Sequence, residues 1–151
     1  MLFRSIIDVS DTGEGCFWPV ELKSMKFDGQ EAKADITSLV FDTGSSYFKG
    51  PACVINALVK AATRGNTLPA YVSKEEELAA YPTITLEIGN QTYTLTPDQY
   101  FLQYNPEYWE IGIQVLDGMP EGMLLVGSMF LEHVYSVYDF KTKKVGLALP
   151  K

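Results

Sequence analysis

The sequence predicts an all-β domain, built mostly from antiparallel strands, with one clear helix. Short segments of alternating apolar and polar residues recur at a spacing of roughly 8–12 residues, divided by Gly, Pro, Asn and Asp turns. Nine tyrosines and eight phenylalanines add aromatic residues, which strands favour. Only residues 51–62 have the apolar i, i+3, i+4 spacing of an amphipathic helix.

We expect the first strands over residues 2–9, 17–27, 31–36 and 39–41. In the second of these strands, the alternation of apolar residues slips by one position near Ser24, which indicates a β-bulge. Asp28-Gly29 is a strong signal for a two-residue hairpin turn after it. The last of the four strands leads directly into Asp42.

The helix is expected to begin at Pro51 and to stop at Gly65, because proline suits a first helical position and glycine a helix end. Thr96-Pro97-Asp98 starts a short helical turn at most. The remaining strands are expected over residues 84–88, 93–95, 109–116, 123–126, 134–138 and 145–149.

Length and charge narrow the classes of function. At 151 residues, the chain is expected to form a single domain, residues 1–151, large enough to bury a core without metals or disulfides. Its net charge of −7 argues against nucleic acid and anionic membranes as partners. No apolar run approaches membrane-spanning length. With one histidine and no CxxC motif, no zinc site can be assembled, and no metal or cofactor is expected.

Residues 38–46 carry the strongest chemical signal. An apolar strand ends at Asp42, and Thr43, Gly44, Ser45 and Ser46 follow. Gly44 allows an unusual turn, and the hydroxyls can bond the loop or the carboxylate, so the segment suits a rigidly held acid or base. An ordinary Asx turn explains the same residues. The second copy of the triplet, Asp11-Thr12-Gly13, lacks a buried strand before it and is interpreted as a turn.

From Cys16 to Lys151, the chain resembles the C-terminal lobe of the pepsin-like aspartic proteases. The similar segments are, in order, residues 17–22 and 25–29, the loop of residues 40–46 with the helix start at 50–51, residues 95–100, Leu124-Leu125-Val126-Gly127, and the closing hairpin at 138–148. The resemblance implies a pepsin-like acid-protease lobe that hydrolyses peptide bonds with a water activated by two aspartates.

The resemblance assigns roles to individual residues. Asp42 would be a catalytic acid or base, and Thr43 would lock the two active-site loops together. Gly44, Ser45 and Ser46 would complete the active-site loop that contacts substrate. Gly127 would let its strand pass close behind that loop.

Only one catalytic aspartate is recognised, and no segment resembles the flap that covers the substrate. The resemblance therefore implies an N-terminal lobe from the same precursor as partner, with the isolated chain inactive on peptides. A homodimer of single lobes, a catalytically inactive binder or inhibitor with this fold, and an incidental triplet on an unrelated β scaffold remain open. The family also implies a secretory or endolysosomal and vacuolar route.

Two departures from the family pattern are visible. Ser128 stands where aspartate is more usual, with no expected effect on chemistry, and the customary disulfide cysteines of the lobe are missing from the corresponding segments. Cys16 and Cys53 are expected to be free thiols. Tyr108 and Trp109 fit either a substrate subsite or the core, and the core is favoured for Trp109.

Overall fold

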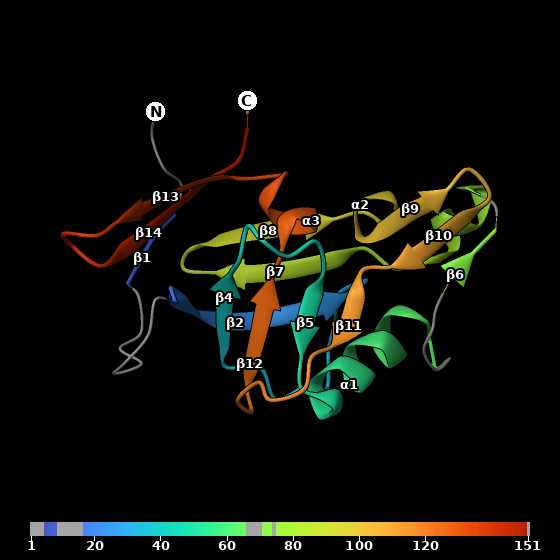
Figure 1. Ribbon diagram of the computed structural model, residues 1–151, viewed down its shortest axis with the longest axis horizontal. Coiled ribbons are helices and arrows are strands. Elements are labelled where there is room, and N and C mark those ends of the chain that lie inside the picture. Colours follow the sequence, from blue (N-terminus) through green and yellow to red (C-terminus); the bar gives the residue numbers. More distant parts are fainter. Residues whose placement is uncertain (1–4, 9–16, 66–70, 74, 151) are drawn as a thin grey trace.

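The computed structural model describes residues 5–8, 17–65, 71–73 and 75–150, and one large sheet runs through the middle of the molecule (Figure 1). The strands of this sheet follow the order β11-β5-β12-β4-β2-β7-β8, with β3 paired to β2. They are β2 (Pro19–Phe27), β3 (Gln30–Glu31), β4 (Ser38–Phe41), β5 (Phe48–Gly50), β7 (Ile84–Ile88), β8 (Gln91–Leu95), β11 (Ile113–Val115) and β12 (Met123–Val126).

Two smaller sheets lie at opposite ends of the molecule (Figure 1). One has the order β1-β14-β13 and contains β1 (Ser5–Asp8), β13 (Tyr135–Asp139) and β14 (Lys144–Ala148). The other has the order β6-β10-β9 and contains β6 (Tyr71–Val72), β9 (Phe101–Asn105) and β10 (Tyr108–Ile111). The helices are α1 (Ala52–Ala62), α2 (Pro97–Tyr100), α3 (Ser128–Leu131) and the 3₁₀ helix η1 (Glu75–Ala80). The predicted all-β class is confirmed.

Helix α1 forms where the apolar spacing predicts it. One face is buried and contains Val54, Ile55, Leu58, Val59 and Ala62. This face packs toward β5 and β11 and joins the main hydrophobic core. The helix starts after Pro51, and the chain leaves it through Gly65, whose φ of +110° suits a glycine and whose N–H donates to the Lys60 carbonyl over 2.9 Å.

Local features of the first hairpin are also confirmed. The pairing of β2 with β7 shifts register between Leu22 and Ser24, where the sequence predicts a bulge. Asp28 and Gly29 both have positive φ, 47° and 80°, as a type I′ turn requires. The predicted turn at residues 11–13 and the thiol of Cys16 lie outside the described residues.

The strand predicted over residues 109–116 is wrong as a single element. It is two strands in different sheets, β10 and β11, joined at Gly112. The Gly112 N–H donates to the Tyr100 carbonyl over 2.7 Å, and its carbonyl accepts from the Phe48 N–H over 2.8 Å. The first bond continues the pairing of β10 with β9, and the second begins the pairing of β11 with β5. The chain therefore passes from one sheet to the other at Gly112.

The returning strand predicted over residues 31–36 is also shorter than expected, because only Gln30 and Glu31 pair with β2 as β3. Beyond it, the Ala34 N–H donates to the Ala32 carbonyl and the Ile36 N–H to the Ala34 carbonyl, over 2.8 and 2.9 Å. These are the i to i+2 bonds of successive tight turns. The alternation of residues 31–36 therefore comes from a turn-rich segment.

The sheets are mostly antiparallel, as predicted, but the centre of the large sheet contains two parallel pairs. Strand β12 lies between β4 and β5, parallel to β4 and antiparallel to β5, and β11 runs parallel to β5. Figure 1 shows β12 in this position, with the connection from β4 to β5 above it. This insertion places the end of β12 against the residues that follow β4.

Replacing Gly112 with alanine should lower the free energy of unfolding by about 1–3 kcal/mol. An added Cβ would lie 2.4 Å from the Met129 sulfur and 3.0 Å from the Tyr100 carbonyl oxygen. Urea unfolding followed by circular dichroism would measure the loss. In a Met129→Ala background the cost of Gly112→Ala should shrink, since one obstruction is gone; an equal cost in both backgrounds would contradict this account.

Candidate active site

Strand β4 delivers Asp42 to the surface from a buried stem. Leu39, Val40 and Phe41 are buried, and the Phe41 ring stacks on Phe130 with centroids 6.1 Å apart. Asp42 itself is half-buried, and its N–H donates to the Val126 carbonyl over 3.0 Å. The backbone of Asp42 is therefore fixed by β4 on one side and by β12 on the other.

The loop after β4 binds its own carboxylate. The Gly44 N–H donates to Asp42 Oδ1 over 2.8 Å, and the Ser45 N–H donates to the Asp42 carbonyl over 3.3 Å. A Cβ on Gly44 would lie 3.2 Å from that Oδ1, so glycine gives the carboxylate room. This hydrogen bond orients the Asp42 carboxylate toward the backbone of its own loop. Among the described residues, no hydrogen bond or ion pair links Asp42 to a second carboxylate or to a cation.

Gly127 lies directly behind this loop. A Cβ there would sit 2.4 Å from the Ser45 carbonyl oxygen and 2.7 Å from that of Tyr47. The backbone of this segment also bonds the loop: the Gly127 N–H donates to Tyr47 over 3.2 Å and the Ser128 N–H to Ser45 over 2.7 Å. The Met129 N–H donates to the Ser46 carbonyl over 3.1 Å. The start of α3 and the end of β12 thus hold the rear of the loop.

The structure brings all of the sequence-predicted site residues together. Thr43, Gly44 and Ser46 are exposed at the tip of the loop, whereas Ser45 is buried against Gly127. The Thr43 hydroxyl has no hydrogen-bond partner within the described chain, and the buried Ser45 hydroxyl has none there either. The loop is therefore bonded from behind through its backbone and open in front.

Sequence reasoning did not single out Tyr47, the residue that ends the loop. Its ring lies against Gly112, with Cδ1 3.4 Å from the position of an added Cβ. Burial raises the pKa of the Tyr47 hydroxyl, and the nearby Glu110 and Tyr104 raise it further. Tyr47 therefore connects the Asp42 loop with the β6-β10-β9 sheet. The one sequence signal that could have identified Tyr47 is its position immediately after the Asp42 motif.

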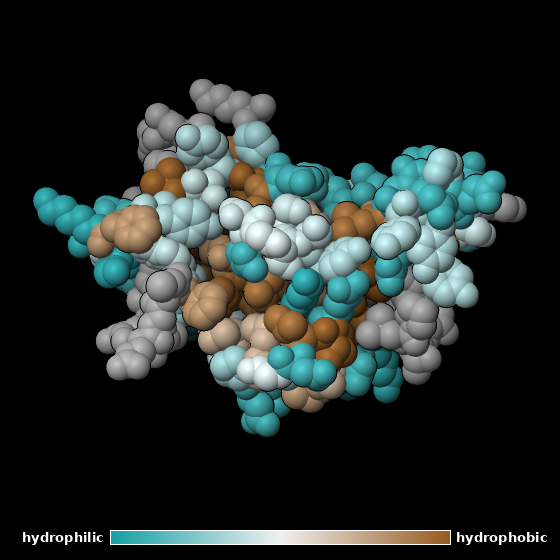
Figure 2. All heavy atoms as spheres, in the orientation of Figure 1, coloured by the Kyte–Doolittle hydropathy of each residue, from teal (hydrophilic) through white to brown (hydrophobic). Residues whose placement is uncertain are grey.

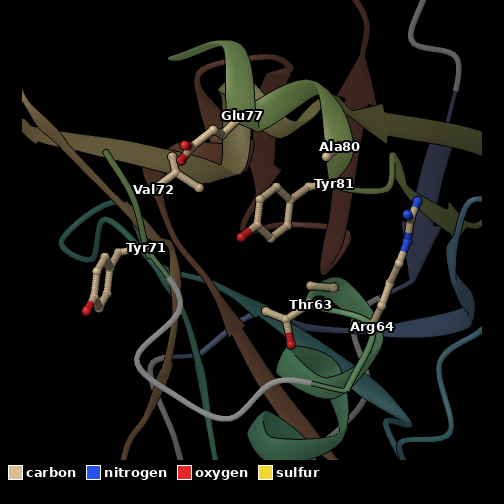
Figure 3. A pocket seen from close by; sticks show the side chains of 8 residues that line it. Thr63, Arg64, Tyr71, Val72, Glu77, Ala80 and Tyr81 are labelled. Atoms are coloured by element: carbon tan, nitrogen blue, oxygen red, sulfur yellow. The ribbon is translucent and has the colours of Figure 1, made fainter. Parts of the chain in front are cut away.

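A separate hollow of about 380 Å³ lies beyond the end of α1 (Figure 3). Figure 3 shows Tyr81 pointing into it, with Thr63 and Arg64 on the α1 side. None of its lining residues belongs to the Asp42 loop or to β12. Thr63 caps α1 by donating to the Val59 carbonyl over 2.7 Å, and Arg64 pairs with Asp28 over 3.5 Å, so these polar groups serve the fold. The candidate chemistry therefore lies on the open loop and not in this hollow.

A carboxylate at the end of a buried strand, a glycine-containing loop around it and a strand threaded behind it form the arrangement that the resemblance to the aspartic proteases implies. The family model for eukaryotic aspartyl protease matches residues 4–150. The chain belongs to this family, and its mostly β, pepsin-like fold agrees with that assignment.

Individual relatives support the same assignment. Cathepsin E of Aquarana catesbeiana is 33% identical over 135 residues, which cover 87% of this chain and 34% of the relative. Renin of Echis ocellatus is 32% identical over 146 residues, covering 93% and 36%, and cathepsin D of Clupea harengus is 29% identical over 139 residues, covering 87% and 35%. The chain spans about a third of the length of these relatives.

Cys53 is an exposed free thiol, as expected from the sequence. Trp109 packs against the core, as favoured, whereas Tyr108 lies on the opposite face of β10. Within the described ranges, no group of three His, Cys, Asp or Glu side chains could hold a metal ion, and no helix there is long and apolar enough to cross a membrane.

Two substitutions at Asp42 should differ in stability, because only one of them keeps an acceptor for the Gly44 N–H. Asp42→Asn keeps an oxygen acceptor at the same place, so the free energy of unfolding should change little. Asp42→Ala removes that acceptor and should lower the free energy of unfolding by about 0.5–1.5 kcal/mol relative to the asparagine variant. Chemical denaturation of both variants measures the difference. If both variants unfold at the same denaturant concentration, the bond does not organise the loop.

Gly127→Ala should be far more damaging than an ordinary glycine substitution. The added Cβ meets two backbone oxygens, which cannot rotate away as a side chain can, so β12 and the loop must separate. We expect a loss of stability of at least about 3 kcal/mol, the upper end of the cost of overpacking. Thermal unfolding is the measurement, and an unchanged midpoint would show that the close approach is not required.

Proposed function

We propose that this chain supplies one of the two aspartates of an aspartic endopeptidase, with Asp42 as that residue. The observation that supports it best is the half-buried carboxylate of Asp42, which follows β4 directly, is bonded by the Gly44 N–H and begins a loop whose rear is fixed. Thr43, Gly44 and Ser46 are exposed beside it, where a peptide backbone and a second loop can reach them.

In the proposed reaction, two carboxyl groups share one proton because two adjacent negative charges are unfavourable. The ionised carboxylate takes a proton from a water, the water oxygen bonds to the peptide carbonyl carbon, and the protonated acid gives its proton to the carbonyl oxygen. The intermediate collapses when the carboxyl that took the water proton gives it to the amine nitrogen and the C–N bond breaks. The other carboxylate takes a proton from a hydroxyl of the intermediate as the C=O bond re-forms, which restores the shared proton. The titration belongs to the pair and not to Asp42 alone.

The second carboxylate would come from an N-terminal lobe of the same precursor. Three observations support this arrangement. The chain covers about a third of each of these relatives, the described residues bring no second carboxylate to Asp42, and the exposed Thr43 hydroxyl has no hydrogen-bond partner among them. On the β1-β14-β13 side, Tyr135, Val137 and Phe140 are exposed. A second lobe that covered them would remove this apolar surface from water.

In this role, Thr43 would bond the opposing loop, Gly44, Ser45 and Ser46 would line the peptide path, and Gly127 would support the loop from behind. Family membership also supports a secretory or endolysosomal route for the whole protein.

Asp42→Asn in the complete protein should lower kcat/KM for a fluorogenic peptide by at least about 100-fold, the usual scale of general acid–base catalysis. Its folding should be unaffected, so unfolding midpoints are measured alongside. Asp98→Asn, at the exposed start of α2, is the matched control and should leave kcat/KM unchanged.

The 151-residue chain alone should not cleave the same peptide. Peptidase activity that elutes with its purified monomer and disappears in Asp42→Asn would defeat the two-lobe proposal. Activity that rises with the square of chain concentration would instead favour a homodimer of single lobes. A complete protein that binds peptides but never cleaves them would favour the inactive binder.

A further inference from the structure

Three tyrosines gather on one face of the β6-β10-β9 sheet. Tyr71 lies 5.3 Å from Tyr108, and Tyr104 lies 6.3 Å from Tyr108 in an edge-on arrangement, both measured between ring centroids. Tyr71 and Tyr104 are 55% and 73% exposed, so this face is not part of the core. Large aromatic rings exposed together are unusual on a surface that binds nothing.

A carboxylate lies among these rings. Glu110 is directly opposite Tyr71 in the pairing of β10 with β6, and it shares a face of β10 with Tyr108, two residues earlier. Burial is the largest cause of the raised pKa of the Tyr108 hydroxyl, followed by the charge of Glu110 and then by Tyr71 and Tyr104. Glu107 adds a second negative charge on the exposed turn between β9 and β10.

The same face continues to the Asp42 loop through Tyr47. Glu110 and Tyr104 both influence the Tyr47 hydroxyl, and the Tyr47 ring lies over Gly112, where β10 passes into β11. In Figure 1 the β6-β10-β9 sheet lies to the right of the loop that joins β4 to β5. In Figure 2 the surface over β9 and β10 is teal and pale, whereas brown apolar atoms gather over β4, β12, β5 and β11. The tyrosine surface is therefore aromatic without being strongly apolar.

Exposed tyrosine rings beside a carboxylate are suited to bind a cationic side chain. The faces of aromatic rings carry negative electrostatic potential and attract Lys and Arg, and a neighbouring carboxylate adds a full charge. The net charge of −7 favours a basic partner over an acidic one. One such contact is already made within the chain, where the Lys49 ammonium lies 5.9 Å from the centre of the Tyr47 ring. Lys49 neutralises part of the charge at that end, so the unoccupied rings are those farther from the loop.

We propose that Tyr71, Tyr104, Tyr108 and Glu110 form a binding face for the Lys or Arg side chains of an extended peptide. We call it the tyrosine face. If the chain is half of an endopeptidase, this face selects substrates with basic residues on one side of the scissile bond. That assignment to substrate rests on the proposed function, whereas the binding of basic peptide does not.

The 151-residue chain encloses its own hydrophobic core, so binding can be measured on it directly. The probes are three capped peptides, (Lys-Gly)₄, (Gln-Gly)₄ and (Glu-Gly)₄, titrated into isotopically labelled chain and followed by NMR. We expect (Lys-Gly)₄ to bind most tightly and to shift the resonances of β6, β9 and β10. Its affinity should fall as salt is raised, because the contact is between charges and exposed rings.

Substitutions of the tyrosines can distinguish binding by the aromatic ring from binding by the hydroxyl. Tyr104→Leu and Tyr108→Leu should each weaken (Lys-Gly)₄ binding about two- to fivefold, the scale of one exposed cation–π contact. Tyr104→Phe keeps the ring and should bind as the parent chain does. Glu110→Gln should weaken binding and reduce its salt dependence. Phe17→Leu, a matched change at an exposed aromatic residue before β2, should have no effect.

Equal affinity for the three peptides, or parent-like binding by the two leucine variants, would overturn the tyrosine face. The outcomes also separate this inference from the proposed function. Basic peptide that binds through these tyrosines, in a complete protein that cleaves nothing, would refute the endopeptidase and leave the tyrosine face standing. Cleavage that depends on Asp42, with no preference for basic peptides in binding or in kcat/KM, would refute only the tyrosine face.

Discussion

The insertion of β12 between β4 and β5 is the constraint on which the candidate site depends. Its parallel register with β4 pairs Val126 with Phe41, so the next carbonyl-to-amide bond reaches Asp42 itself. One residue later, Gly127 passes so close to the loop that no side chain fits between them. The carboxylate therefore stands on backbone that is bonded from the side and from behind, and little conformational freedom is left for it to lose when it binds a ligand.

The same construction explains why the site is rigid on one side and open on the other. Every hydrogen bond that the loop receives from α3 and from the end of β12 goes to its backbone carbonyls, while Thr43, Gly44 and Ser46 are exposed. A site built this way needs a second surface to complete it. The Tyr47 ring lies against Gly112, and the Phe48 N–H donates to the Gly112 carbonyl, so the residues after the loop contact the chain where β10 ends and β11 begins.

Much of this arrangement could be predicted from the sequence. Leu39, Val40 and Phe41 are apolar because they are buried beneath Asp42, and the helical spacing after Pro51 marks the buried face of α1. Patterns of this kind record which side of an element is buried, but they do not record which strand is the neighbour. The alternation of apolar and other residues through Ile111, Ile113 and Val115 is unbroken, yet the chain passes from one sheet to another at Gly112.

The parts of the site that could not be predicted arise from contacts between distant segments. The close approach of Gly127 to the Ser45 carbonyl, and that of the Tyr47 ring to Gly112, depend on strand order and not on local composition. Tyr108 and Trp109 are neighbours in sequence with opposite environments, because successive residues of a strand face opposite sides. The resemblance to a known family supplied the order of segments that local patterns lack.

The late position of β12 in the chain has a consequence for biosynthesis. Residues 42–47 leave the ribosome well before residues 123–129, which donate the amides that bond the Ser45, Ser46 and Tyr47 carbonyls. Until then those carbonyls are bonded to water or to transient partners, and contacts between such distant segments form slowly. A nascent polypeptide would therefore carry its acidic motif unassembled until residues 123–129 had emerged, and this part of the site would form only after them.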